Sequence, residues 1–246
     1  MNSHPETEPL IDIKDKEFQN EKEIESLIND QIRKGFIVKV YSILLIQLLI
    51  TTLFVILAFY FPSLKSFLNN STLFYILALI LIFSVFPFLI CYPHLLKVVP
   101  YNYIILFVFT LGESYLVAMF TCNYTPKSVI VALILTLSTV LSLTYYAWTC
   151  KSDFTIYGGV LVNLLFLLIV GSFILIFVRI PFLYLVTDIF SLMLFSAYLI
   201  YDTQIIVRND TKYHITSEDY ILAALNLYLD IINIFLEFLS LFGSRN

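Results

Sequence analysis

The sequence predicts an all-α membrane protein built as a seven-transmembrane-helix bundle. Hydrophobic residues make up 60% of the 246 residues and charged residues only 13%, and the mean hydropathy is +0.90. Soluble domains carry roughly twice that share of charge. Seven apolar runs reach the length of about 20 residues that crosses a hydrocarbon layer about 30 Å thick. All seven are expected to be helices, because an open strand leaves backbone groups unpaired in lipid.

The first 35 residues form an acidic arm ahead of the first span. They hold nine acids against five bases, so the whole net charge of -4 lies here. Apolar residues recur among these charges at approximate helical spacing, at Phe18, Ile24, Leu27, Ile28 and Ile32. This pattern predicts an amphipathic helix on a membrane surface, with a solvated, frayed tail as the alternative. No apolar stretch follows a basic start, so no cleavable signal peptide is expected. No basic patch points to nucleic acid.

The seven predicted spans follow one another with mostly short links, so neighbours in sequence should pack side by side. They cover residues 36–61, 72–91, 101–121, 128–148, 156–178, 181–201 and 220–242. The three cysteines, Cys91, Cys122 and Cys150, lie at span ends without metal-ligand spacing, and no cofactor is expected.

The lysines and arginines beside the spans predict the orientation. With the amino terminus in the cytosol, eight lie in inside flanks: Lys22, Arg33, Lys34, Lys39, Lys97, Lys151, Arg208 and Lys212. Four lie in outside flanks: Lys65, Lys127, Arg179 and Arg245. The amino terminus is therefore expected in the cytosol and the carboxyl terminus outside or in a lumen. A re-entrant last segment, with both ends cytosolic, is the alternative.

Acids within the spans are not matched by bases. The acids at membrane depth or at its edge are Glu113, Asp188, Asp202, Asp230 and Glu237, and no lysine or arginine lies deep in a run. A carboxylate near the bilayer centre costs at least about 2.5 kcal/mol, so such acids must be protonated, share protons or hold a cation.

Asp230 in the middle of the last run and Asp202 at the end of the preceding run are the expected pair. Antiparallel neighbours would bring them together, and two close acids cannot both ionise cheaply, so they are predicted to share a proton. The pair is then a pH sensor, and once ionised it offers transient oxygen ligands to Ca²⁺. The alternative for Asp202 is a polar helix end at the membrane interface.

The other acids have less specific interpretations. Glu237 lies two turns from Asp230 on one face, about 10 Å along the axis, and is a candidate for the same cation path. Glu113 is a further candidate, with a protonated acid bonded locally as the alternative. Asp188 is interpreted as a solvated residue at a helix start. Asn226 and Asn233 flank Asp230 at i−4 and i+3, so they are expected to orient its carboxyl group.

A long motif and several short ones carry a family resemblance. They are residues 217–236 (SEDYILAALNLYLDIINIFL), Arg33 with residues 36–41 and Gln47, residues 109–111 with Glu113, residues 151–154, and residues 201–204. These residues resemble the transmembrane Bax inhibitor motif family, in its Lifeguard and Golgi anti-apoptotic protein branch. The resemblance covers most of residues 30–243.

The resemblance implies a seven-helix fold with the last helix central, in Golgi or endoplasmic reticulum membranes. It also implies a pH-sensitive calcium leak that modulates calcium stores and restrains apoptosis, with Asp202 and Asp230 as the paired acids. Glu218 matches an acidic position near the pore. One feature departs from the family pattern, because relatives pair the two acids with an arginine in the second span and this chain has none there.

Other classes of protein fit less well. The main alternative is a non-conducting scaffold that regulates cell death through membrane proteins of cell-death or calcium-release pathways. An intramembrane aspartyl protease would need Gly-x-Gly-Asp where Leu227, Tyr228 and Leu229 precede Asp230. A receptor fits by span count alone, and a retinal protein would need a lysine in the last span. No enzymatic activity is expected.

Overall fold

The computed structural model of the protein describes residues 7–91, 97–208 and 219–245. Within these ranges the chain is helical and forms no strand, apart from an isolated bridge between Tyr124 and Arg245. The helices are α1 (Thr7–Tyr60), α2 (Pro62–Asn70), α3 (Thr72–Cys91), α4 (Tyr101–Thr121), α5 (Pro126–Thr149), the short 3₁₀ helix η2 (Phe154–Tyr157), α6 (Gly158–Phe177), α7 (Pro181–Val207) and α8 (Tyr220–Phe242).

The helices confirm the predicted all-α membrane fold. Six of them are long and apolar enough to cross a membrane. A seventh span is reached if the pair Pro62–Leu68 and Thr72–Leu81, which is bent by 70°, counts as one crossing. Helix α2 was not predicted. It begins with Pro62 at its first position, where the missing N–H of proline costs no hydrogen bond.

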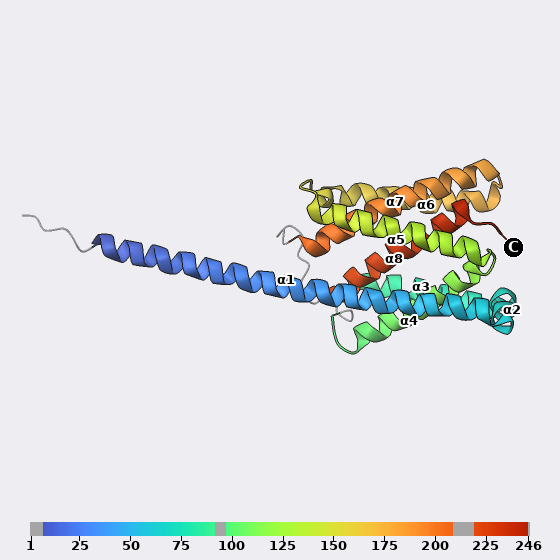
Figure 1. Ribbon diagram of the computed structural model, residues 1–246, viewed down its shortest axis with the longest axis horizontal. Coiled ribbons are helices and arrows are strands. Elements are labelled where there is room, and N and C mark those ends of the chain that lie inside the picture. The colour runs from blue at the N-terminus through green and yellow to red at the C-terminus, as the bar shows by residue number, and fades with distance from the viewer. Residues whose placement is uncertain (1–6, 92–96, 209–218, 246) are drawn as a thin grey trace, which may run out of the picture.

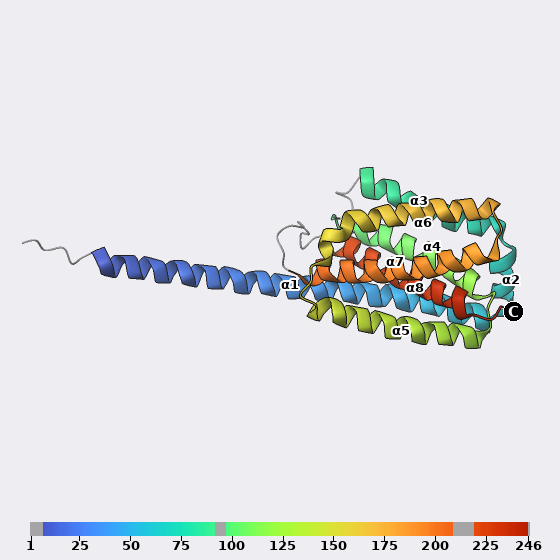
Figure 2. The same ribbon diagram turned by 90° about the horizontal axis from the view of Figure 1, so that it is seen from above.

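Helix α1 is longer than the predicted first span. It runs unbroken for 54 residues, so the helix expected in the arm is continuous with the membrane-spanning part rather than a separate element. Figures 1 and 2 show α1 extending beyond the bundle at the end opposite to α2. The placement of the amino-terminal arm in the cytosol stays a prediction.

Helix α8 is the centre of the bundle, as expected. It packs against α1, α4, α5 and α7, and Figures 1 and 2 show it running between them. Thirteen of its 23 residues are buried. Since these lie on several faces of the helix, α8 has contacts around most of its circumference.

The α5–α6 connection is tied to the end of α7. The side chain of Gln204 donates to Ser152 O at 3.0 Å and accepts from Phe154 N at 2.8 Å. Arg208 donates to the carbonyls of Cys150 and Ser152 and lies 3.5 Å from Asp153. These contacts let α7 continue to Val207, six residues past its predicted end.

We expect Gln204→Ala to destabilise the protein by about 1–3 kcal/mol, because a buried side chain loses two hydrogen bonds and leaves their partners in the loop without them. Thermal unfolding of the purified protein in detergent measures the change. Gln31→Ala, at an exposed position of α1, is the matched control and should melt like the wild type. Equal melting of the two variants would show that the loop contacts add nothing to stability.

Candidate acid-pair site between α7 and α8

The structure brings Asp202 and Asp230 together. Asp202 lies in the last two turns of α7 and Asp230 in the middle of α8, the helix pair with the most extensive contact in the bundle. Both side chains are buried, with 7% and 4% of their surface exposed. The two carboxyl groups lie within hydrogen-bonding reach of each other. Asp202 is therefore part of a helix and enclosed, not a polar end in solvent.

No basic side chain of the described residues forms a salt bridge with either acid. Arg33 of α1 instead donates to the carbonyls of Ile205 and Arg208, one and two turns beyond Asp202. It thereby caps the end of α7, where the final carbonyls lack partners within the helix. Among the described residues, therefore, no basic side chain binds the acids in place of the second-span arginine that the family resemblance implied.

The surroundings of the pair contain polar atoms without partners in the structure. These buried atoms are Asp230 Oδ2 and the Tyr198 hydroxyl. Tyr198 lies close enough to both acids for electrostatic interaction. Buried polar groups are usually satisfied by protein or by ordered water. These atoms are therefore able to form hydrogen bonds with ordered water.

A cavity of about 340 Å³, with both polar and aliphatic side chains in its lining, opens beside Asp202. Its lining includes Asp202 and Asn226 at the inner side and Asp219, Ile205 and Leu222 toward the helix ends. Asp219 forms an ion pair with Lys97 at 2.9 Å. The cavity therefore leads from the end of the bundle that carries the α7–α8 connection to Asp202.

Two further acids lie along the same helix interface. Ser191 donates to Glu237 at 2.6 Å, and Ser240 donates to Asp188 at 2.7 Å. The prediction that Asp188 is a solvated residue at a helix start is wrong. This residue lies seven positions inside α7, is half-buried and bonds to α8. Helix α7 begins at Pro181, where the predicted span begins, so Asp188 lies about two turns inside the helix and not at its start.

Glu113 lies elsewhere. It is half-buried on α4 and interacts electrostatically with Tyr228, which is two residues before Asp230 and so about 200° around α8. The structure thus does not bring Glu113 to the acid pair. Glu218 lies outside the described residues.

The two asparagines do not act as expected on Asp230. Asn226 reaches Asp202 on the neighbouring helix. Asn233 donates to Leu229 O of its own helix at 2.8 Å. The spacing i−4 and i+3 places them on one face with Asp230, but the crossing of α7 over α8 brings Asp202 closer to Asn226.

A second polar network was not predicted as a site. Thr51 of α1 lies 2.9 Å from the Ser114 hydroxyl and 2.8 Å from the Tyr228 hydroxyl, and Gln47 donates to Thr110 at 3.0 Å. A sequence pattern that could have predicted this network is the recurrence of polar residues four positions apart within apolar runs, at 47 and 51 and at 110 and 114. The network joins α1 and α4 to α8.

The fold and the acid pair define a multi-pass membrane protein. Two buried acids, without a basic partner among the described residues, lie between its last two helices. Comparison with known proteins agrees. The family model described as inhibitor of apoptosis-promoting Bax1 matches residues 33–246. Protein lifeguard 4 of Mus musculus is 35% identical over 217 residues, covering 87% of both chains.

Two other relatives are equally extensive matches. A BI1-like protein of Arabidopsis thaliana is 38% identical over 216 residues, which is 85% of this chain and 80% of the relative. The Golgi anti-apoptotic protein of Vaccinia virus (strain Lister) is 34% identical over 215 residues, which is 87% of each. The chain belongs to the Bax inhibitor family, a family of non-enzymatic membrane proteins implicated in the inhibition of apoptosis.

Proposed function

We propose that the protein is a pH-sensitive calcium leak channel of intracellular membranes, which modulates calcium stores and thereby restrains apoptosis. The observation that carries the proposal is the buried contact between Asp202 and Asp230 without a basic partner among the described residues. The names of the lifeguard and Golgi anti-apoptotic relatives support the link to cell death.

The proposed gate is the hydrogen bond between the two acids. While they share a proton, it holds α7 and α8 together. When the proton leaves, two carboxylates face each other, and at about 4 Å in a medium of effective dielectric about 20 they repel by about 4 kcal/mol. That energy changes the ratio of closed to open forms by a factor of about a thousand. Rising pH should therefore open the interface, and falling pH should close it.

The proposed path follows the α7–α8 interface. The cavity leads to Asp202, which lies within hydrogen-bonding reach of Asp230. Glu237 lies seven residues further along α8, about 10 Å down the axis. Within the described residues no three His, Cys, Asp or Glu side chains form a metal-holding group. Two carboxylates alone bind Ca²⁺ weakly, since it takes six to eight oxygens, and weak binding suits an ion in passage.

The proposed orientation places the acid-pair cavity on the cytosolic side. Lys97, Lys151 and Arg208 lie at this end of the bundle, where the positive-inside rule puts the cytosol. The amino-terminal arm projects from the same end (Figure 1). A Golgi or endoplasmic reticulum membrane would place the carboxyl terminus in the lumen, and the channel would then release stored calcium toward the cytosol.

The test is calcium flux through the purified protein in phospholipid vesicles, with a calcium indicator enclosed and the outer pH varied from about 5 to about 8. We expect slow flux at acid pH that increases as the pH rises. Vesicles without protein give the background rate. Flux equal to that background at every pH would refute the channel and favour the non-conducting scaffold, whose partners would be sought among membrane proteins of cell-death or calcium-release pathways.

A further inference from the structure

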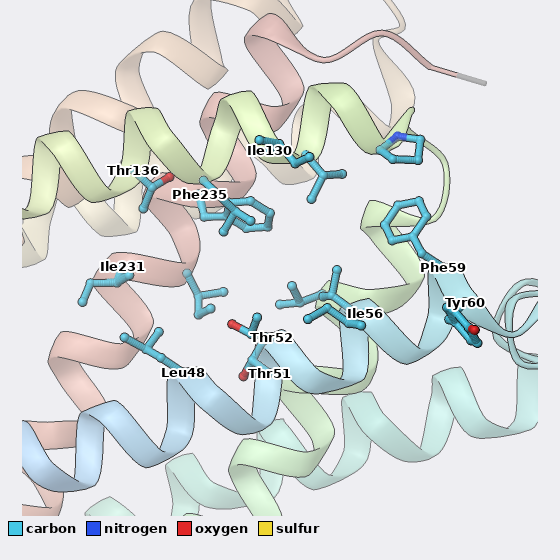
Figure 3. A pocket seen from close by; sticks show the side chains of 16 residues that line it. Leu48, Thr51, Thr52, Ile56, Phe59, Tyr60, Ile130, Thr136, Ile231 and Phe235 are labelled. Atoms are coloured by element: carbon cyan, nitrogen blue, oxygen red, sulfur yellow. The ribbon is translucent and has the colours of Figure 1, made fainter.

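An apolar groove runs along the outside of the bundle between α1 and α5. Both helices pack closely against α8 but not against each other, so α8 forms the floor of the gap that they leave. Figure 3 shows the side chains of the three helices facing into it, with Leu48 and Ile231 toward one end and Phe59 and Tyr60 at the other. The cavity has a volume of about 500 Å³.

We propose that this groove binds one acyl chain of a membrane phospholipid, whose phosphate lies at Lys127. The proposal is independent of calcium conduction. No charged residue lines the groove. The hydroxyl of Thr51 is bonded to α4 and α8, and that of Thr136 donates to Ala132 O at 2.8 Å. Of the four hydroxyl groups that line the groove, those of Thr51 and Thr136 are thus already paired within the bundle. The rest of the lining is mostly aliphatic and aromatic, so the wall suits hydrocarbon rather than a polar ligand.

The length of the groove matches one leaflet. Leu48 and Tyr60 are 12 residues apart on α1, which corresponds to about 18 Å along the helix. Half of a hydrocarbon layer of about 30 Å is about 15 Å, so an acyl chain of one leaflet fills this distance. A second cavity of about 390 Å³ shares Leu48 and Ile231 and continues toward Trp148 at the opposite end.

The charges at the Tyr60 end complement a phosphate. The connections at this end contain Lys65, Lys127, Arg179 and Arg245 and no Asp or Glu. Lys127 follows Pro126 of the groove, is exposed, and forms no salt bridge within the part of the chain that the structure describes. A lysine at the lipid headgroup level attracts phosphate.

The bound chain would contact the central helix directly. Ile231 and Ile232 of α8 line the groove, and Ile231 follows Asp230. Hydrocarbon in the groove would therefore pack against α8 at the residue next to Asp230. Without it, the floor residues would lose packing partners on one side.

The experiment is native mass spectrometry of the delipidated full-length protein titrated with dioleoyl phosphatidylglycerol. We expect one tightly bound lipid. Leu133→Trp places an indole in the groove and should weaken this binding about tenfold, the effect of displacing about two CH₂ groups. Leu137→Trp, one turn further along α5 at an exposed position outside the groove, is the matched control and should bind like the wild type.

A second pair of variants tests the phosphate contact without changing the groove. Lys127→Gln should weaken binding about fivefold, with less effect at high salt, while Lys151→Gln beyond the other end of α5 should have no effect. The proposal fails if the wild type retains no lipid, or if Leu133→Trp and Leu137→Trp lose lipid equally. Displacement of the phospholipid by equimolar cholesterol would also overturn it, since the occupant would then be a sterol.

Discussion

Replacing Asp230 with asparagine is expected to abolish the pH dependence of calcium flux through the purified protein. An amide keeps the size of the side chain and is able to donate a hydrogen bond to Asp202, but it has no acidic proton to lose. The repulsion of about 4 kcal/mol that is proposed to open the wild-type interface at high pH then never develops. We expect the flux ratio between about pH 8 and about pH 5 to exceed tenfold for the wild type and to fall below about twofold for the variant.

The reciprocal change makes this test stricter. If the two acids share one proton, as proposed, Asp202→Asn should remove the pH dependence as completely as Asp230→Asn. Asp30→Asn makes the same chemical change at an exposed position of α1 and should leave the flux ratio at its wild-type value. A pH response that survives in both pair variants would place the sensor elsewhere, and Glu237 would become the first candidate.

The spans and the acid pair followed from the sequence for simple physical reasons. A run of about 20 apolar residues has one stable form in lipid, so α4 and α8 begin and end at the residues predicted. Acids without nearby bases in adjacent antiparallel spans have few ways to be satisfied other than each other. That reasoning placed Asp202 beside Asp230 without any coordinates.

The remaining features depend on how the helices cross, which local sequence does not specify. The end of α7 was misplaced because it is held by residues about 50 and 170 positions away. Gln204 bonds to the α5–α6 loop, and Arg33 donates to the backbone carbonyl of Ile205. Asn226 was predicted to orient Asp230 on the same helix, but it reaches Asp202 across the interface with α7. Glu113 was a candidate by residue type alone, and the rotation of α4 turns it toward Tyr228 instead.

Replacing Tyr228 with alanine is expected to produce the largest loss of stability of any variant considered. The side chain is fully buried in α8, packs edge-on against Phe109 with ring centroids 6.5 Å apart, and bonds through its hydroxyl to Thr51. Large-to-alanine changes in soluble cores cost about 3–5 kcal/mol. This is an upper value here, because the unfolded chain in a membrane already has hydrocarbon around it and only packing and hydrogen bonds are lost.

Two further variants act as controls. One separates the contribution of the ring to stability from that of the hydroxyl, and the other compares a core tyrosine with a surface tyrosine. Tyr228→Phe keeps the ring and should cost about 1 kcal/mol, since hydrogen bonds between membrane helices are worth little more. Tyr145→Ala removes an equal side chain that is 71% exposed and should change stability little. Thermal unfolding in detergent ranks all three. If Tyr228→Ala melted like Tyr145→Ala, α8 would not be the packed centre that holds α1 and α4 in place, and the acid pair would lose the rigid support that the gate requires.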